Sequence, residues 1–104
     1  MSLQAINENG FLVLSPDGPM NAETSPTLDR DILQAVEESV SPVVLDFARV
    51  PFISSLGLRT VVKVAKAVKD RAPLIVSGLQ PQLVEMFRLA GLDRLVEIRD
   101  AIRT

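Results

Sequence analysis

The chain has 104 residues, of which 47% are hydrophobic and 23% are charged, and its formal net charge is −2. This length suits one domain with a single core, and we expect residues 1–104 to form it. No apolar run approaches the roughly 20 residues of a membrane-spanning helix, so we expect no direct membrane insertion. The acidic balance supplies no basic surface for a nucleic-acid backbone, which argues against nucleic acid as a partner.

The sequence contains no Cys and no His. It therefore lacks thiolate and imidazole metal ligands, a cysteine nucleophile, and the side chain that most often acts as a general base near neutral pH. We expect no enzymatic activity, no metal and no cofactor. No N-terminal segment combines basic residues with an apolar stretch and a small-residue cleavage site, so we expect a cytoplasmic protein.

The first elements in the chain are two expected strands, residues 3–7 and 11–15. The turn-rich connector Glu8-Asn9-Gly10 predicts that they form an antiparallel hairpin. Pro16-Asp17-Gly18-Pro19 then ends the second strand, and we expect Pro19 and the following Met20 to be exposed.

The first helix is expected to begin at Ser25-Pro26, with Ser25 as N-cap and proline at the first helical position, and to run to about residue 39. Asp29 belongs to the polar face of this helix, which we expect to be solvated. The apolar stripe comprises Leu28, Ile32, Ala35, Val36 and Val40.

The middle of the chain alternates strand and helix. Residues 43–47 form an apolar run without strict alternation, which predicts a strand buried on both faces. A helix is expected from Ser55 to about Lys69, with a basic outer face that includes Arg59, Lys63 and Lys66. Its expected buried residues are Leu58, Val61, Val62, Ala65 and Val68.

The last third repeats this pattern. A strand is expected at 73–77, a helix at 81–90 that ends at Gly91, a strand at 95–98, and a short helical turn at 100–104. The expected core side of the helix comprises Leu83, Val84, Phe87 and Leu89. Together the elements predict the α/β class: an N-terminal β-hairpin leading into a mostly parallel sheet with packed helices.

The most informative motif is Phe52-Ile53-Ser54-Ser55-Leu56-Gly57-Leu58-Arg59, where a buried strand and loop give way to a helix. Ser54 is a good N-cap, because its oxygen can accept an unpaired first-turn N–H, and Ser55 then occupies the first helical position. A phosphate at that position is favoured by the helix dipole and the free amides. The alternative interpretation is a plain N-cap followed by a solvated serine.

This run resembles the I-S-S-A-G-L-R and I-D-S-S-G-L signatures of the STAS domain, the fold of bacterial anti-sigma factor antagonists. The resemblance implies a STAS-like fold over nearly the whole chain and implies Ser55 as the phosphoacceptor. Two turns extend it, since Gly18-Pro19-Met20-Asn21 is similar to the family's Gly-x-Leu-Asp turn and Leu89-Ala90-Gly91-Leu92 to its late S-G-L turn. Two departures lie beside the acceptor: Ser54 where many relatives have Asp, and the bulky Leu56 where they have Ser, Thr or Ala.

Several residues are expected to support the acceptor. Gly57 allows close packing of the helix against a strand. The basic stripe is either a solvated helix face or, because it starts beside Ser55, part of a docking surface. The expected partner-binding and supporting residues are Asn21, Asp46, Ser54, Leu56, Gly57, Arg59 and Lys63.

Two functions are compatible with the sequence. In the first, which the resemblance implies, an anti-sigma factor that is also a serine kinase binds the unphosphorylated chain, phosphorylates Ser55 and releases it, and a serine phosphatase restores it. ATP and magnesium then belong to the kinase. In the second, the chain is a non-phosphorylated STAS accessory or scaffold subunit of a lipid ABC transporter or a sensory complex, a role that Leu56 favours.

Overall fold

Five strands form one mixed sheet in the order β1-β2-β3-β4-β5 in the computed structural model, which describes residues 2–99. The strands are β1 (Ser2–Glu8), β2 (Phe11–Asp17), β3 (Val43–Asp46), β4 (Ile75–Ser77) and β5 (Glu97–Arg99). β1 pairs antiparallel with β2, and every later neighbour pair is parallel. The expected hairpin leading into a mostly parallel sheet is therefore confirmed.

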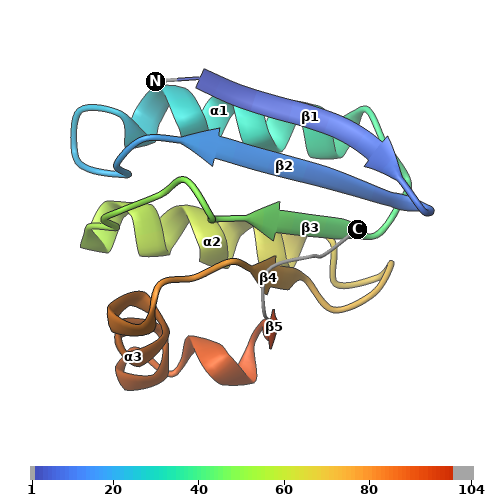
Figure 1. Ribbon diagram of the computed structural model, residues 1–104. Helices are drawn as coiled ribbons and strands as arrows, with labels where there is room; N and C mark the ends of the chain where they lie inside the picture. The colour runs from blue at the N-terminus through green and yellow to red at the C-terminus, as the bar shows by residue number, and fades with distance from the viewer. Residues whose placement is uncertain (1, 100–104) are drawn as a thin grey trace.

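The helices are α1 (Ser25–Glu37), α2 (Ser55–Ala67) and α3 (Pro81–Leu89), and a short 3-10 helix, η1 (Leu92–Arg94), precedes β5. α1 and α2 lie side by side on one face of the sheet, behind it in Figure 1. Among residues 2–99, none of these helices combines the length and the apolar character that crossing a membrane requires.

The hairpin turn follows from its two central residues. Asn9 has a φ of 53° and Gly10 a φ of 84°, and the strands close with Glu8 opposite Phe11. A two-residue turn with positive φ at both positions matches the twist of the flanking strands, and Asn and Gly adopt it at low cost. The turn pairs β1 with β2, and β2 pairs on its other edge with β3, where the parallel part of the sheet begins.

The main core lies between the sheet and the helices, and alternate strand residues point into it. Leu14 of β2, Leu45 of β3 and Val76 of β4 are fully buried against α1 and α2. The intervening residues Val13, Val44 and Ile75 form a separate apolar cluster on the opposite face. Burial on both faces explains why the central strands read as continuous apolar runs.

The first helix differs from the expectation at both ends. Ser25 is its first helical residue rather than its N-cap, and Thr24 precedes it without a side-chain cap. The helix ends at Glu37, so Val40 lies beyond it and is 90% exposed. The prediction of a buried apolar stripe is confirmed at Leu28, Ile32 and Val36. Val40 does not join this stripe, because the helix has already ended before it.

In the C-terminal third, the expected helix and strand are present, but their ends differ from the expected positions. α3 ends at Leu89, whose side chain is 82% exposed rather than in the core, and Gly91 follows with a left-handed φ of 76° as expected. η1 delays the last strand to Glu97–Arg99, two residues after its expected start. The helical turn expected at 100–104 lies outside the described residues.

Candidate functional site at the start of helix α2

The segment between β3 and α2 is tied to the loop that follows β2. Met20 N–H donates to Phe52 O at 2.8 Å, and Ser54 N–H donates to Met20 O at 2.7 Å. Met20 and Ile53 form an isolated parallel bridge, and both are fully buried. Met20 is therefore a core residue and not the exposed one we expected, because this bridge draws the loop onto the start of α2.

Ser54 is the N-cap of α2, as its sequence position predicts. Its backbone is extended, with φ −84° and ψ 176°, and its Oγ accepts a hydrogen bond from Gly57 N–H at 3.4 Å. Leu58 N–H then donates to Ser54 O at 3.0 Å, which is the first hydrogen bond of the helix. The Ser54 hydroxyl is therefore directed at the backbone of the first turn.

Gly57 sits where the first turn touches the bridged loop. A Cβ at this position would lie 2.7 Å from Ile53 Cγ2, 3.0 Å from Met20 Cβ and 3.2 Å from Met20 O. The 2.7 Å separation is shorter than real Cβ contacts, and the other two, one of them to backbone, are tighter than most such contacts, so the loop would have to shift. Glycine lets the helix start this close to the loop without a shift of the neighbouring residues, which supports the packing role expected for it.

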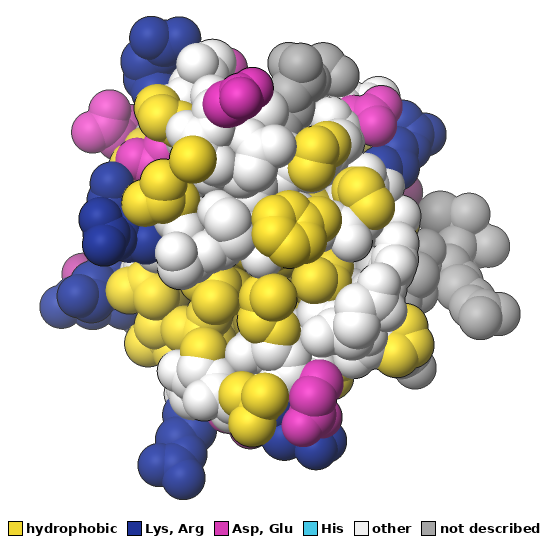
Figure 2. All heavy atoms as spheres, turned by 90° about the vertical axis from the view of Figure 1, so that its left-hand side faces the viewer, with side chains coloured by type: hydrophobic (Ala, Val, Ile, Leu, Met, Phe, Trp, Pro, Cys, Tyr) yellow, Lys and Arg dark blue, Asp and Glu magenta, His cyan; other side chains and the backbone are white. Residues whose placement is uncertain are grey.

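Ser55 is exposed at the first helical position, next to an apolar surface. The neighbouring Leu56 is 36% exposed and Phe52 in the preceding loop is 50% exposed. Figure 2 shows this side of the molecule, on which hydrophobic side chains gather while Lys and Arg lie along its margins. The sequence interpretation missed Phe52 as a surface residue, although an aromatic residue beside a loop proline was a usable signal.

Asn21 lies close to this surface, but its side chain organises the start of α1. Its Oδ1 accepts hydrogen bonds from Glu23 N–H at 2.9 Å and Thr24 N–H at 3.0 Å, while Asn21 N–H donates to Thr24 Oγ1 at 3.0 Å. Because Met20 is bonded to Ser54, these contacts also fix the loop that flanks the start of α2.

Asp46 is not brought to Ser55. It follows Leu45 in β3, so its side chain lies on the face of the sheet opposite the main core. There it accepts a hydrogen bond from Ser15 Oγ at 3.4 Å and another from Ala48 N–H at 3.1 Å. The carboxylate lines a cavity with β1 and β2 residues instead of the helix start.

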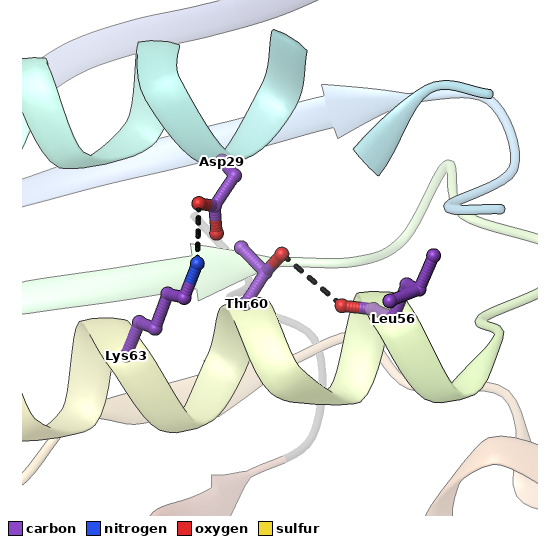
Figure 3. A network of polar contacts seen from close by, with 4 residues as sticks. All are labelled: Asp29, Leu56, Thr60 and Lys63. Carbon is purple, nitrogen blue, oxygen red and sulfur yellow. Dashed lines mark hydrogen bonds and ion pairs between the residues drawn. The ribbon is translucent and has the colours of Figure 1, made fainter. Parts of the chain in front are cut away.

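Arg59 and Lys63 follow Ser55 along α2. Both are exposed, and Lys63 Nζ forms an ion pair with Asp29 Oδ2 of α1 at 2.9 Å (Figure 3). Asp29, which we expected to be solvated, is only 19% exposed in its side chain. The 34-residue separation between Asp29 and Lys63 leaves no local pattern that would have predicted this pair.

The site offers no ligand set for a metal. Within residues 2–99, no three acidic side chains come together in a way that would hold an ion. What the site presents is an exposed hydroxyl at a helix start, an apolar surface around it and cationic side chains beside it.

Comparison with known proteins identifies the family. The STAS domain model matches residues 2–104. The chain is 32% identical over 92 residues to a Bordetella bronchiseptica protein named putative anti-sigma factor antagonist BtrV, covering 88% of this chain and 79% of that protein.

The fold is also found in solved structures of other bacterial proteins. An anti-sigma factor antagonist from Mycobacterium paratuberculosis superposes with a TM-score of 0.84 at 23% identity, covering 93% of this chain and 83% of that one. The Bacillus cell fate determinant SpoIIAA in its phosphorylated form gives a TM-score of 0.72 at 19% identity, covering 98% and 93%. The chain belongs to the STAS domain family, and its relatives place it among the anti-sigma factor antagonists.

Proposed function

We propose that this chain is a phosphorylation-switched binding module. It holds an anti-sigma factor that is also a serine kinase while Ser55 is unmodified, and releases it once Ser55 carries a phosphate. The observation that carries this proposal is the exposed position of Ser55 as the first residue of α2, directly after a serine that caps the helix. The chain is substrate and ligand, while ATP and magnesium belong to the kinase.

Electrostatics at the start of a helix support a reversible phosphate there. A phosphoserine carries about −1.5 to −2 charges at pH 7, and at a helix N-terminus it meets unpaired amides and the positive end of the dipole. The same charge would have to lose its water in an interface centred on Phe52 and Leu56, which are apolar. The modified chain therefore keeps its fold and loses its partner.

The relatives support the same assignment. BtrV carries anti-sigma factor antagonist in its name, and SpoIIAA has been solved in both unphosphorylated and phosphorylated forms. A serine phosphatase would return this chain to its binding form.

A phosphorylation assay tests the proposal. The purified chain is incubated with ATP, magnesium and each anti-sigma factor kinase encoded in the genome of its host, and its intact mass is measured. We expect one added phosphate, mapped to Ser55 by fragmentation. Ser55→Ala should take up none, while Ser54→Ala should still be modified. Phosphate retained in Ser55→Ala but lost in Ser54→Ala would assign the switch to Ser54.

A second candidate is a non-phosphorylated accessory or scaffold subunit of a lipid ABC transporter or a sensory complex. The observation that favours it is Leu56, whose bulky side chain is 36% exposed beside Ser55 and would hinder a kinase in reaching the Ser55 hydroxyl. The intact mass of the protein isolated from its own host under phosphatase inhibition separates the two. A phosphorylated fraction supports the switch, whereas its absence under every growth condition, with an ABC operon around the gene, supports the scaffold.

A further inference from the structure

The cations of α2 near the candidate phosphoacceptor differ in whether their charge is already neutralised. Lys63 is held by Asp29 of α1 through the 2.9 Å ion pair drawn in Figure 3, and the two charges of this pair cancel. Arg59 is exposed and, among residues 2–99, forms no ion pair. Its guanidinium is therefore a free positive charge about one helical turn from Ser55.

The geometry of a helix directs Arg59 toward Ser55. Residues four apart lie on the same side of a helix, with their Cβ atoms about 5–6 Å from each other. Long helical side chains lean toward the N-terminus, so the side chain at position 59 covers the turn that contains position 55. The pair is also more favourable when the anion belongs to the N-terminal residue and the cation to the C-terminal one. An anion at Ser55 would meet both conditions.

No other charged residue of α2 is placed to take the position of Arg59. Lys63 lies eight residues from Ser55, about 12 Å along the helix axis, and is already paired. The sequence of α2 contains no Asp or Glu that would repel a phosphate or neutralise Arg59. Asp29, Arg59 and Lys63 all line the groove between α1 and α2, so two cations face one carboxylate there. The remaining positive charge favours an anion.

We propose that Arg59 binds the phosphate of phosphorylated Ser55 as an intramolecular clamp. This inference rests on the proposed function, since it names what holds the modified side chain. A guanidinium can donate two parallel N–H bonds to phosphate oxygens, which makes arginine better suited to this contact than lysine. Phosphorylation would then change the surface that a partner meets in two ways, because it adds an anion and also removes Arg59 as a free cation.

A titration of the phosphate tests the clamp. Phosphoserine is incorporated at position 55 during synthesis of the chain, so the sample does not depend on a kinase, and its second ionisation is followed by phosphorus NMR. A nearby guanidinium favours the dianion, so the second pKa of the phosphoserine should be a few tenths of a pH unit higher in Arg59→Gln than in wild type. Lys66→Gln is the control, because Lys66 is exposed on the same helix but lies too far from position 55 to reach the phosphate. It should titrate as the wild type does, and identical titrations of wild type and Arg59→Gln would overturn the clamp.

Thermal melts of the same samples give an independent measure. The unmodified wild type and unmodified Arg59→Gln should melt alike, because the exposed Arg59 has no ion pair to lose among residues 2–99. Phosphoserine at position 55 should raise the melting temperature more in wild type than in Arg59→Gln, since only wild type gains the contact. Equal effects of the phosphate in the two backgrounds would mean that the guanidinium stays in water, which contradicts the proposal.

The outcomes also separate this inference from the proposed function. If no anti-sigma factor kinase modifies Ser55 of the wild-type chain, the proposed function fails whatever the titration shows. If Ser55 is modified and the partner is released, while the phosphate titrates identically in wild type and Arg59→Gln, the switch stands and only the clamp is wrong.

Discussion

Ser54 and Gly57 act at the scale of single residues, and each holds the first turn of α2 in place by a different means. Ser54 Oγ accepts a hydrogen bond from Gly57 N–H at 3.4 Å, and this amide would otherwise be unbonded. Gly57 has no side chain, and this leaves room for Met20 and Ile53 to pack against the first turn of the helix. The position of Ser55 depends on both, because it stands between them in the same turn.

Replacing Ser54 by Ala should lower the free energy of unfolding by about 0.5–2 kcal/mol, the usual cost of removing an N-cap. Urea melts followed by circular dichroism measure this. Ser55→Ala is the matched control and should stay within about 0.5 kcal/mol of wild type, since Ser55 is exposed. Equal midpoints for Ser54→Ala and wild type would show that the hydroxyl does not cap the helix.

Replacing Gly57 by Ala should also destabilise the chain. Alanine favours a helix over glycine by about 1 kcal/mol, but a Cβ 2.7 Å from Ile53 Cγ2 and 3.2 Å from Met20 O forces a shift that typically costs about 1–3 kcal/mol. We expect a net loss of about 1 kcal/mol in the same melts. Lys66→Ala, exposed on the same helix, should leave stability unchanged. A gain in stability for Gly57→Ala would show that the loop yields easily.

At the scale of elements, the start of α1 is organised one turn before its first helical residue. Asn21 Oδ1 accepts hydrogen bonds from two backbone N–H groups, and Thr24 Oγ1 accepts one from Asn21 N–H, so the chain enters the helix through a hydrogen-bonded turn. The Ser25-Pro26 pair predicted a cap at Ser25, but Pro26 is the second helical residue and the Ser25 hydroxyl bonds to nothing within residues 2–99.

Asn21→Ala should therefore destabilise the chain by about 0.5–2 kcal/mol, as loss of an N-cap does, whereas Ser25→Ala should not destabilise it. Hydrogen exchange should locate the loss in the amides of Glu23 and Thr24, which donate to the Asn21 side chain. The reverse order of stabilities would restore Ser25 as the cap.

At the scale of the whole molecule, the proposed switch would separate folding from binding. The phosphate would sit at the solvent-facing start of α2, outside the core between the sheet and the helices. A charge placed there changes what a partner meets without entering the packed interior.

Phosphorylation of Ser55 should consequently leave the melting temperature equal or slightly higher, while affinity for the anti-sigma factor falls at least tenfold, about 1.4 kcal/mol. The comparison uses the enzymatically phosphorylated chain, because Ser55→Asp carries only about half the charge. A large drop in melting temperature would indicate disruption of the fold. Equal affinities of the two forms would favour the scaffold function instead.

Features governed by short-range chemistry were predictable from the sequence alone. Asn9-Gly10 specified the hairpin turn, Ser54 the start of α2, and Gly91 the left-handed residue after α3. Each of these features depends on the φ preference, or on the hydrogen-bonding side chain, of one or two residues. Such preferences are properties of the residues themselves and do not require distant parts of the chain. The apolar runs of the central strands likewise indicated a mostly parallel sheet.

Only the tertiary structure decided which side chains meet across elements. It buried Met20 through its bridge to Ile53, paired Asp29 with Lys63, and placed Asp46 on the far face of the sheet. These outcomes depend on how the layers assemble, because an apolar or charged side chain has no preferred distant partner until the sheet and helices bring one within reach. The helix start and its candidate phosphoacceptor were therefore local properties of the chain, whereas the ion pair between Asp29 and Lys63 exists only in the folded protein.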